Sequence, residues 1–420
     1  MSVSTKNTTA WAMVNENGDL VIPKDVVDRY GLNPGAKVRL DEGTNFIRMH
    51  RPVTHLTKIY IEPTVSCNLD CITCFRNAWD EPNGKMSDET FLAIFESLRK
   101  MDPIPNVYFG GIGEPLFHPK TIDWIKMVKT LGVKVEMITN ATMLTEKISR
   151  KIIDSGLDVL WVSIDGATPE TYEDVRLGAE LPKILENLHK FNSMRKGGHF
   201  PLPELGFAFV AMKRNIHELP KVIEMGQSLR VKHYSVSNLQ PATADMQADR
   251  LYDRSLHSIA FMNADSTPSL SLPKMDLTDV TRGPLFDAFN SGCNVNFAGN
   301  NWGGASDVCN FVESGTMSIN WKGEVAPCWP LMHTHDTFLH NKPHRNHKHI
   351  IGMVQEESLE DLWLSKEYVA YRERLHNFAF APCTFCGGCD YSKENIEDCF
   401  GNDAPVCGVC LWAQGVIQCP

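Results

Sequence analysis

Short apolar runs alternate with longer amphipathic segments along the middle of the chain. The apolar runs predict strands at 58–63, 106–109, 134–138, 159–164, 204–211 and 232–237. The amphipathic segments between them predict helices near 87–101, 120–131, 145–155, 183–193 and 216–229. Strands that alternate with helices build a parallel sheet. Six units predict an α/β fold, a partial (βα)6 barrel over residues 53–245, with its chemistry at the carboxyl ends of the strands.

Two further zones flank this barrel. In residues 1–52, glycine and proline punctuate every element, which predicts a small β module with a helix at 25–30 and a strand at 37–40. Residues 246–420 form a linker and a cysteine-rich domain that starts near Cys293. We therefore expect three domains, with boundaries near residues 52 and 245.

Composition and charge exclude several classes of protein. The chain has 420 residues, 43% of them hydrophobic, which is enough for two or three domain cores. Its net charge of −10 argues against broad nucleic-acid binding. No export signal and no apolar run of membrane-spanning length is visible. Thirteen clustered cysteines favour metal ligation in the reducing cytoplasm over a disulfide framework.

The strongest chemical signal is the CxxxCxxC spacing of Cys67, Cys71 and Cys74, directly after the first predicted strand. Three thiolates in one loop hold three irons of a cubane cluster and leave the fourth iron open to a small molecule. Zinc sites favour paired CxxC units instead. The loop resembles that of the radical S-adenosylmethionine (SAM) enzymes. The resemblance implies a [4Fe-4S] cluster that cleaves SAM reductively to a 5′-deoxyadenosyl radical, fed by a low-potential ferredoxin or flavodoxin.

Further motifs follow the next strands, as the barrel rule requires. A glycine run such as Gly110-Gly111-Ile112-Gly113-Glu114 is by itself most often a tight turn. After the second strand of this chain it resembles the radical SAM element whose backbone receives the SAM amino group. The same resemblance implies that SAM is bound by Phe75, Gly110, Gly111, Gly113, Glu114, Asn140, Ser163, Asp165 and Arg176.

The C-terminal cysteines carry a second resemblance. Cys309, Gly323 and Cys328 are spaced as in the first half of SPASM domains, which hold auxiliary iron–sulfur clusters, whereas the second half is tighter than usual. The ten candidate ligands are Cys293, Cys309, Cys328, Cys383, Cys386, Cys389, Cys399, Cys407, Cys410 and Cys419. Two four-iron clusters need eight thiolates, so two of the ten are not required. Cys293 has no cysteine close to it in the sequence, so it is also a candidate for a buried free thiol. We expect Cys309 and Cys328 to share one cluster with a tail cysteine, and Cys383 and Cys386 to share the other with residues nearer Cys419.

The N-terminal module resembles the AbrB/SpoVT swapped hairpin, through its "IPK" turn at 22–24 and "GLNPG" turn at 31–35. Free-standing relatives dimerise and bind DNA. Here residues 1–52 carry seven basic and six acidic side chains, a net charge of about +1. So small a positive charge argues against DNA binding, and we therefore expect a docking or homodimerising role.

The C-terminal stretch 398–420, DCFGNDAPVCGVCLWAQGVIQCP, looks most like that of the radical SAM maturases associated with tungsten-cofactor oxidoreductases, which also carry an AbrB-like front end. Taken together, these resemblances cover nearly the whole chain. The resemblance implies modification of a protein, a peptide or a cofactor during maturation of such an oxidoreductase. One alternative is a maturase that cross-links ribosomal peptides, and another is an iron–sulfur redox-sensing transcription regulator. A sulfatase-type maturase is disfavoured, because Trp329 stands where those enzymes carry a carboxylate. The six histidines between 333 and 349 lie among basic residues and predict a solvated loop.

Overall fold

A computed structural model describes residues 10–43, 46–79, 81–253, 268–289, 291, 293–297, 300–302, 307–339, 341–384, 386 and 389–420. A nine-stranded sheet curves through its centre in the order β10-β9-β8-β7-β6-β5-β14-β15-β18. Within the described ranges, no helix is both long and apolar enough to cross a membrane. The predicted α/β fold with a parallel sheet is confirmed.

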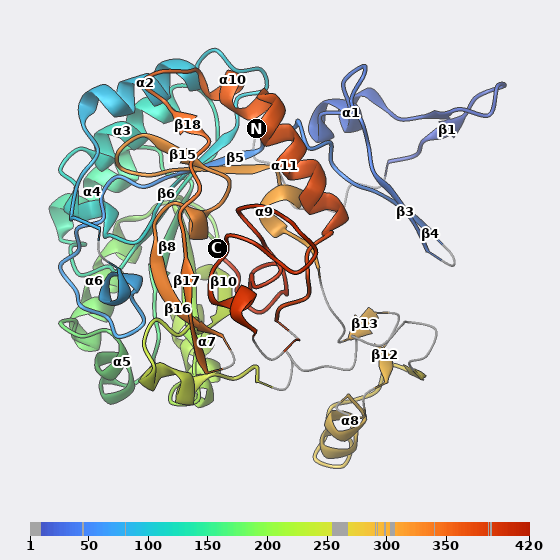
Figure 1. The fold of residues 1–420 in the computed structure, drawn as a ribbon. Coiled ribbons are helices and arrows are strands. Elements are labelled where there is room, and N and C mark those ends of the chain that lie inside the picture. Colours follow the sequence, from blue (N-terminus) through green and yellow to red (C-terminus); the bar gives the residue numbers. More distant parts are fainter. Residues whose placement is uncertain are drawn as a thin grey trace.

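The first six strands of this sheet are parallel and form the partial barrel (Figure 1). They are β5 (Lys58–Ile61), β6 (Asn106–Phe109), β7 (Val135–Thr139), β8 (Val159–Ser163), β9 (Glu204–Ala211) and β10 (Val231–Asn238). All five residues of β8 are buried, as expected for a parallel strand covered on both faces. Each strand overlaps the predicted one to within two residues at either end.

The barrel helices cover the outer face of the sheet (Figure 1). They are α2 (Asp88–Leu98), α3 (Thr121–Lys129), α4 (Glu146–Asp154), α5 (Pro169–Val175), α6 (Leu181–Met194) and α7 (Leu219–Ser228). Side-chain caps explain where several begin: Ser87 accepts a hydrogen bond from the Thr90 amide, and Thr145 accepts one from that of Ile148. Among the described α-helices of the barrel, only α5 was not predicted from the sequence pattern. It has seven residues, too few for a clear helical period.

The cysteine-rich region continues the barrel sheet rather than standing apart from it. Strand β14 (Thr316–Ile319) pairs in parallel with β5, and β15 (Glu324–Ala326) and β18 (Gly352–Met353) follow antiparallel. Helices α9 (Asn310–Glu313), α10 (Leu359–Leu364) and α11 (Lys366–Asn377) complete this part. The Arg372 side chain on α11 is buried, and it donates 2.7 Å to the Val53 carbonyl just before the barrel. Barrel and cysteine-rich region therefore share one core.

The histidine-rich segment is not the solvated loop that the sequence pattern suggested. It forms the hairpin β16 (His335–Leu339) and β17 (Lys342–Asn346) with the turn before it, and His333, His335 and His344 are buried. His340 lies outside the described residues. The basic residues between the histidines are typical of an exposed loop and led to that prediction. In the structure, buried and partly exposed residues alternate along β16, and its histidine points inward.

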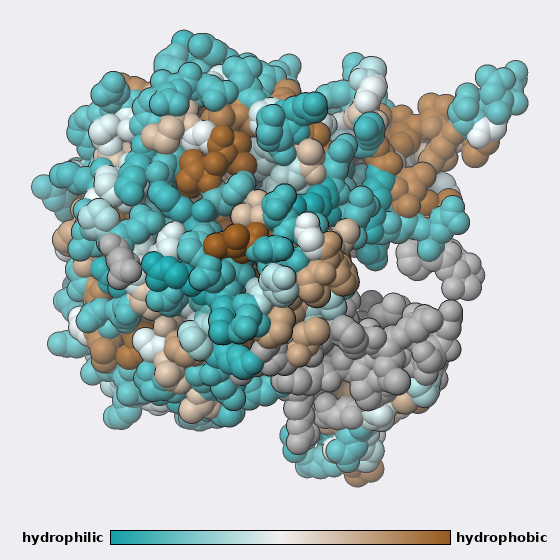
Figure 2. All heavy atoms as spheres, in the orientation of Figure 1, coloured by the Kyte–Doolittle hydropathy of each residue, from teal (hydrophilic) through white to brown (hydrophobic). Residues whose placement is uncertain are grey.

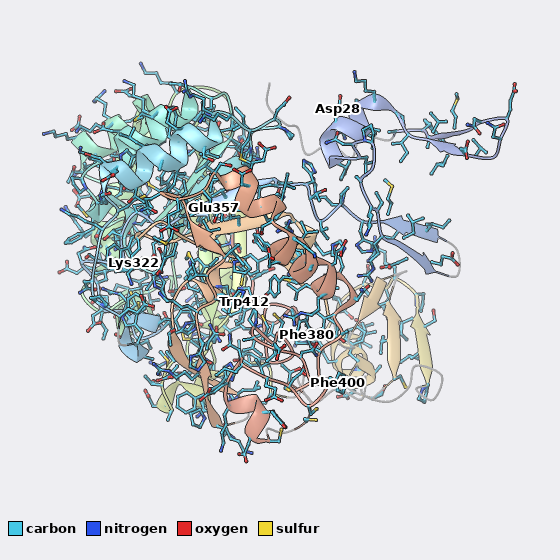
Figure 3. The ribbon with its side chains drawn as sticks, turned by 45° about the horizontal axis from the view of Figure 1, so that its top comes forward. Asp28, Lys322, Glu357, Phe380, Phe400 and Trp412 are labelled. Atoms are coloured by element: carbon cyan, nitrogen blue, oxygen red, sulfur yellow. The ribbon has the colours of Figure 1, made fainter. Side chains whose placement is uncertain are left out.

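The N-terminal module stands beside this body (Figures 1 and 3) and leaves much of its apolar surface uncovered. It contains β1 (Met13–Val14), β2 (Leu20–Val21), α1 (Lys24–Tyr30), β3 (Leu40–Gly43) and β4 (Phe46–Met49). No residue of α1 is buried, and hydrophobic atoms gather on the module in Figure 2. A second small unit holds β11 (Ser269–Leu272), α8 (Arg282–Phe289), β12 (Asn294–Phe297) and β13 (Asn300–Trp302).

Candidate active site

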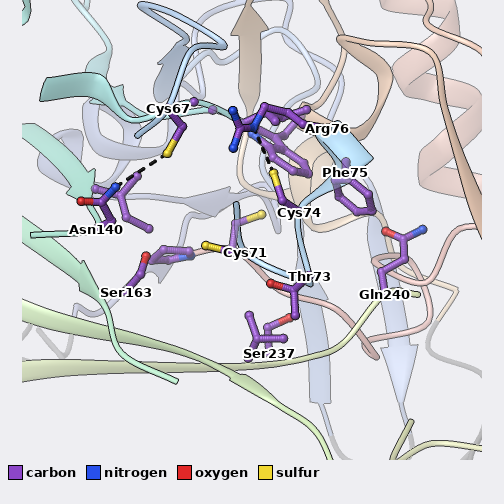
Figure 4. Close-up of a pocket in the computed structure, with 18 of the residues that line it drawn as sticks. Cys67, Cys71, Thr73, Cys74, Phe75, Arg76, Asn140, Ser163, Ser237 and Gln240 are labelled. Atoms are coloured by element: carbon purple, nitrogen blue, oxygen red, sulfur yellow. Dashed lines mark hydrogen bonds between the residues drawn. The ribbon is translucent and has the colours of Figure 1, made fainter. Parts of the chain in front are cut away.

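The loop after β5 brings Cys67, Cys71 and Cys74 to one cavity of about 290 Å³ at the carboxyl ends of the barrel strands (Figure 4). Polar N–H groups approach all three sulfurs. The Leu69 amide lies 3.4 Å from Cys67 Sγ, and Arg76 Nε lies 3.3 Å from Cys74 Sγ. Donors of this kind stabilise thiolates and tune the cluster that thiolates hold.

Two of these donors come from later parts of the chain, one directly after β7 and one at the C-terminal end of α5. Asn140, directly after β7, places Nδ2 3.7 Å from Cys67 Sγ, and Arg176 places Nη1 3.9 Å from Cys71 Sγ. Burial raises the pKa of the Cys67 and Cys71 thiols, so the thiolate form depends on such donors and on a bound metal. The donor set therefore fits an anionic three-cysteine site.

The glycine run forms the next part of the cavity wall. Gly111, Ile112 and Gly113 line it, whereas Gly110 packs on the Tyr108 ring outside the lining. A Cβ on Gly113 would lie 2.2 Å from the Thr64 carbonyl oxygen, which is backbone and cannot move aside. Glycine is thus required for the run to pass so close to the segment that leads into the cysteine loop.

Glu114 lines the cavity, but its carboxylate is already engaged. The buried group accepts hydrogen bonds from the Leu116 amide at 3.0 Å, from Thr139 Oγ1 at 2.8 Å and from the Asn140 amide at 2.7 Å. Burial raises its pKa. Glu114 therefore joins the loops after β6 and β7, and it fixes the backbone from which Asn140 reaches Cys67.

Asp165 and Arg176 form a buried ion pair beside the cavity. Arg176 lines the cavity and donates from Nε to Asp165 Oδ2 at 2.6 Å, and the Val210 amide donates to Asp165 Oδ1 at 2.7 Å. Removing one partner of such a pair costs about 3–5 kcal/mol. Asp165 is fully buried and not part of the lining, so it orients Arg176 instead of facing the cavity.

Phe75 and Ser163 line the cavity as expected, and several further residues join them. These are Thr73, Arg76, Ser237, Asn238, Gln240, Trp329 and Trp412. The Phe75 and Trp329 rings lie 5.6 Å apart, and those of Trp329 and Trp412 lie 6.3 Å apart. The barrel rule could have indicated the three residues around the end of β10, but no local pattern marks the two tryptophans.

Eight of the ten C-terminal cysteines lie near one another in two sets of four. Burial and the thiols of Cys309, Cys410 and Cys407 raise the pKa of Cys328. Burial and the thiols of Cys389, Cys399 and Cys386 raise the pKa of Cys383 to about 12. Among the described residues, no three His, Cys, Asp or Glu side chains are placed to hold a single metal ion. A cubane does not need three side chains around one metal ion, because each of its thiolates binds a different iron.

This grouping differs in part from the one expected from the sequence. Cys309 and Cys328 lie near the tail cysteines Cys407 and Cys410, whereas Cys383 lies near Cys386, Cys389 and Cys399. Cys419 lies in the wall of the active-site cavity. Cys293 directly precedes β12 in the small separate unit. The two cysteines outside the groups are thus Cys293 and Cys419.

Comparisons with known proteins agree with this architecture. Residues 61–203 match the radical SAM superfamily, and residues 309–390 match the SPASM iron–sulfur cluster-binding domain. The tungsten-containing aldehyde ferredoxin oxidoreductase cofactor-modifying protein of Pyrococcus furiosus is 30% identical over 371 residues, 86% of this chain and 96% of that protein. The chain belongs to this family of radical SAM enzymes.

More distant relatives share the barrel. The AdoMet-dependent heme synthase of Methanosarcina barkeri is 28% identical over 49% of this chain and 58% of its own length. The structure of native anSMEcpe with bound AdoMet has a TM-score of 0.52 at 13% identity, covering 85% of this chain and 95% of that one. Streptococcus suis SuiB bound to S-adenosylmethionine has a TM-score of 0.50 at 15% identity, covering 76% and 68%. These structures share the fold of this chain. The radical SAM and SPASM matches show that this enzyme uses SAM and [4Fe-4S] clusters, one in the barrel and others in the SPASM domain.

Proposed function

We propose that this radical SAM enzyme modifies a tungsten-dependent oxidoreductase, either its protein or its cofactor, during maturation. The observation that carries the proposal is the similarity to the Pyrococcus furiosus cofactor-modifying protein across 96% of that protein's length. The cluster-ligand and SAM-binding roles of the cavity residues are part of the proposal. A cavity whose lining suits SAM favours an enzyme over a redox-sensing regulator, because a regulator would not need a SAM site.

Cys67, Cys71 and Cys74 would hold the barrel cluster, and the Gly111–Gly113 backbone and Arg176 would bind SAM beside it. When bound, cluster and SAM supply reductive cleavage to a 5′-deoxyadenosyl radical that abstracts a hydrogen atom from the substrate. The residues of the chain would bind the cluster and SAM and orient them. Asp165 holds Arg176 toward Cys71, and Glu114 holds the backbone of Asn140. Phe75, Trp329 and Trp412 form an apolar wall that excludes water.

A direct experiment tests the substrate. A tungsten-dependent oxidoreductase from the same cells, purified from a strain that lacks this chain, is incubated anaerobically with the reconstituted enzyme, SAM and reductant. We expect a mass change in the oxidoreductase or its extracted cofactor, with formation of 5′-deoxyadenosine above the substrate-free level. An unrelated protein of similar size serves as the control. No mass change, together with turnover of a ribosomal peptide encoded nearby, would favour the cross-linking alternative.

The electron donor belongs to the same proposal. Reductive cleavage of SAM needs a low-potential electron, which a ferredoxin or flavodoxin of the reducing cytoplasm would supply. The structure has no disulfide among the thirteen cysteines.

We further propose that the N-terminal module pairs two copies of the enzyme, as its resemblance to swapped hairpins implies. Trp11 is 82% exposed, Ile47 is 70% exposed and Leu20 is 63% exposed. A module of about 40 residues cannot bury a sufficient core alone. A second copy of the same module would cover these apolar side chains across a two-fold axis.

Deleting residues 1–52 is expected to convert a dimer to a monomer, to lower substrate turnover and to spare substrate-free SAM cleavage. The double variant Leu20→Lys/Ile47→Lys should also give a monomer, because it places charge on the proposed interface without shortening the chain. Asn17→Lys, which changes an exposed polar residue of the same module, is the matched control. Light scattering reports the mass. An unchanged mass in both the deletion and the double variant would rule out the dimer interface.

A further inference from the structure

A buried histidine lies between two carboxylates behind the glycine run. His333 is only 1% exposed, and its Nε2 lies 2.6 Å from Glu62 Oε2 while its Nδ1 lies 3.2 Å from Glu81 Oε2. Both ring nitrogens face a carboxylate oxygen, so the doubly protonated imidazolium can donate at both ends. The cavity residues described above do not include His333.

Glu62 extends this contact to the SAM-binding wall. It directly follows β5 and is fully buried, and its other oxygen, Oε1, accepts a hydrogen bond from the Ile112 amide at 3.0 Å. Gly111 adopts a φ of +142°, where a Cβ would lie 2.5 Å from Glu62 Cγ. The Glu62 side chain thus supports the run Gly111–Gly113 from behind, at the residues that line the cavity.

The histidine comes from the SPASM part of the chain. It lies two residues after the short 3-10 helix Trp329–Leu331, whose first residue lines the cavity and follows the cluster cysteine Cys328. Glu81 is held from the same side, by the Thr334 amide at 3.2 Å and by Lys322 Nζ at 3.3 Å. One hydrogen-bonded path therefore leads from the auxiliary-cluster region to the SAM loop.

The charges around His333 favour its protonated form. Burial lowers its pKa, but the carboxylates of Glu62 and Glu81 outweigh burial and raise it to about 9. Of the neighbouring cationic groups, Lys322 pairs with Glu81, and burial lowers the pKa of His335 to about 4, which leaves that ring neutral. At neutral pH the imidazolium is thus matched by two carboxylates.

We propose that His333 is a positioning residue through which the SPASM domain sets SAM affinity, because it fixes Glu62 and so the Gly111–Gly113 backbone. The inference rests on the proposed SAM site at this loop. Loss of the His333 contact would free Glu62 and loosen the loop before SAM binds. SAM would then bind more weakly, while chemistry at saturating SAM would change little.

The test is equilibrium dialysis of SAM without reductant on the reconstituted enzyme, next to the steady-state kinetics of SAM cleavage. His333→Gln keeps bulk, but its donors lie on one nitrogen and it has no positive charge, so it cannot hold both carboxylates as the imidazolium does. Its Kd for SAM should rise about tenfold, with kcat within about twofold of wild type. Glu62→Gln can still accept from Ile112 but loses the charge that holds the imidazolium, so it should give a smaller rise. His347→Gln, at a half-exposed histidine paired with Glu394 at 3.1 Å, is the matched control and should bind SAM as wild type does.

The pH profile separates positioning from a general loss of structure. Because the His333 pKa is raised, its contribution is complete at neutral pH and is lost as pH rises through about 9. The ratio of the His333→Gln Kd to the wild-type Kd should therefore fall from about ten at pH 7.5 toward one near pH 10. A ratio of one throughout, or a raised ratio that does not change with pH, would overturn the inference. A wild-type enzyme unable to bind SAM would instead overturn the SAM site itself.

Discussion

Cys71→Ala is expected to abolish reductive cleavage of SAM while leaving the fold and the auxiliary iron in place. Cys71 is the most buried of the three loop cysteines, and its sulfur faces the Arg176 guanidinium. Without its thiolate the barrel cluster has two protein ligands and cannot be held. The fold should survive, because the substitution removes one sulfur atom and the barrel core is built from the strands and helices around it.

The measurement is anaerobic product analysis with dithionite, next to iron content and circular dichroism. We expect background levels of 5′-deoxyadenosine, about four irons fewer than in the wild type and an unchanged spectrum. Cys293→Ala is the matched control, since this cysteine lies outside all three cysteine groups, and it should retain iron and activity. Undiminished 5′-deoxyadenosine from Cys71→Ala would refute the assignment of the catalytic cluster.

The second large effect concerns the auxiliary clusters. The reconstituted enzyme should contain about twelve irons per chain, four in the barrel and four in each C-terminal cysteine group. The double variant Cys328→Ala/Cys407→Ala removes half of one group, and Cys383→Ala/Cys399→Ala removes half of the other. Each double variant should lose about four irons and retain the barrel cluster, since neither changes a residue of the cysteine loop.

Cys419 decides between the two ways of grouping these cysteines. The structure puts Cys399 with Cys383, Cys386 and Cys389, and places Cys419 in the cavity wall. Cys419→Ala should therefore keep about twelve irons. Loss of about four irons in Cys419→Ala but not in Cys399→Ala would restore the grouping expected from the sequence. About four irons in the wild type would show that the C-terminal cysteines hold zinc or no metal.

The barrel could be predicted from the sequence because its elements carry local periodic signals. Buried parallel strands give short apolar runs, and the helices between them are long enough to show an apolar face. The continuation of the sheet through β14 could not be predicted, because β14 pairs with a strand more than 250 residues earlier. Pairing at such a distance leaves no local pattern.

The candidate active site likewise has features that could be predicted from the sequence and features that could not. The spacing of the cysteine loop and of the glycine run predicted which segments line the cavity. It did not predict that Glu114 and Asp165 would direct their carboxylates at neighbouring loops and at Arg176, since hydrogen-bond partners depend on the packed fold. Trp329 and Trp412 reach the cavity only because the cysteine-rich region folds against the barrel. His333 was predicted to be solvated because its partners, Glu62 and Glu81, lie far from it in the sequence and meet it only in the folded chain.

The most direct test of the central claim is product analysis of the wild-type enzyme. The reconstituted protein is incubated anaerobically with SAM and dithionite, and methionine and 5′-deoxyadenosine are quantified over time. Radical SAM chemistry predicts equal amounts of both products, formed only when cluster, SAM and reductant are all present. A fully reconstituted enzyme that binds SAM but forms no 5′-deoxyadenosine would contradict it.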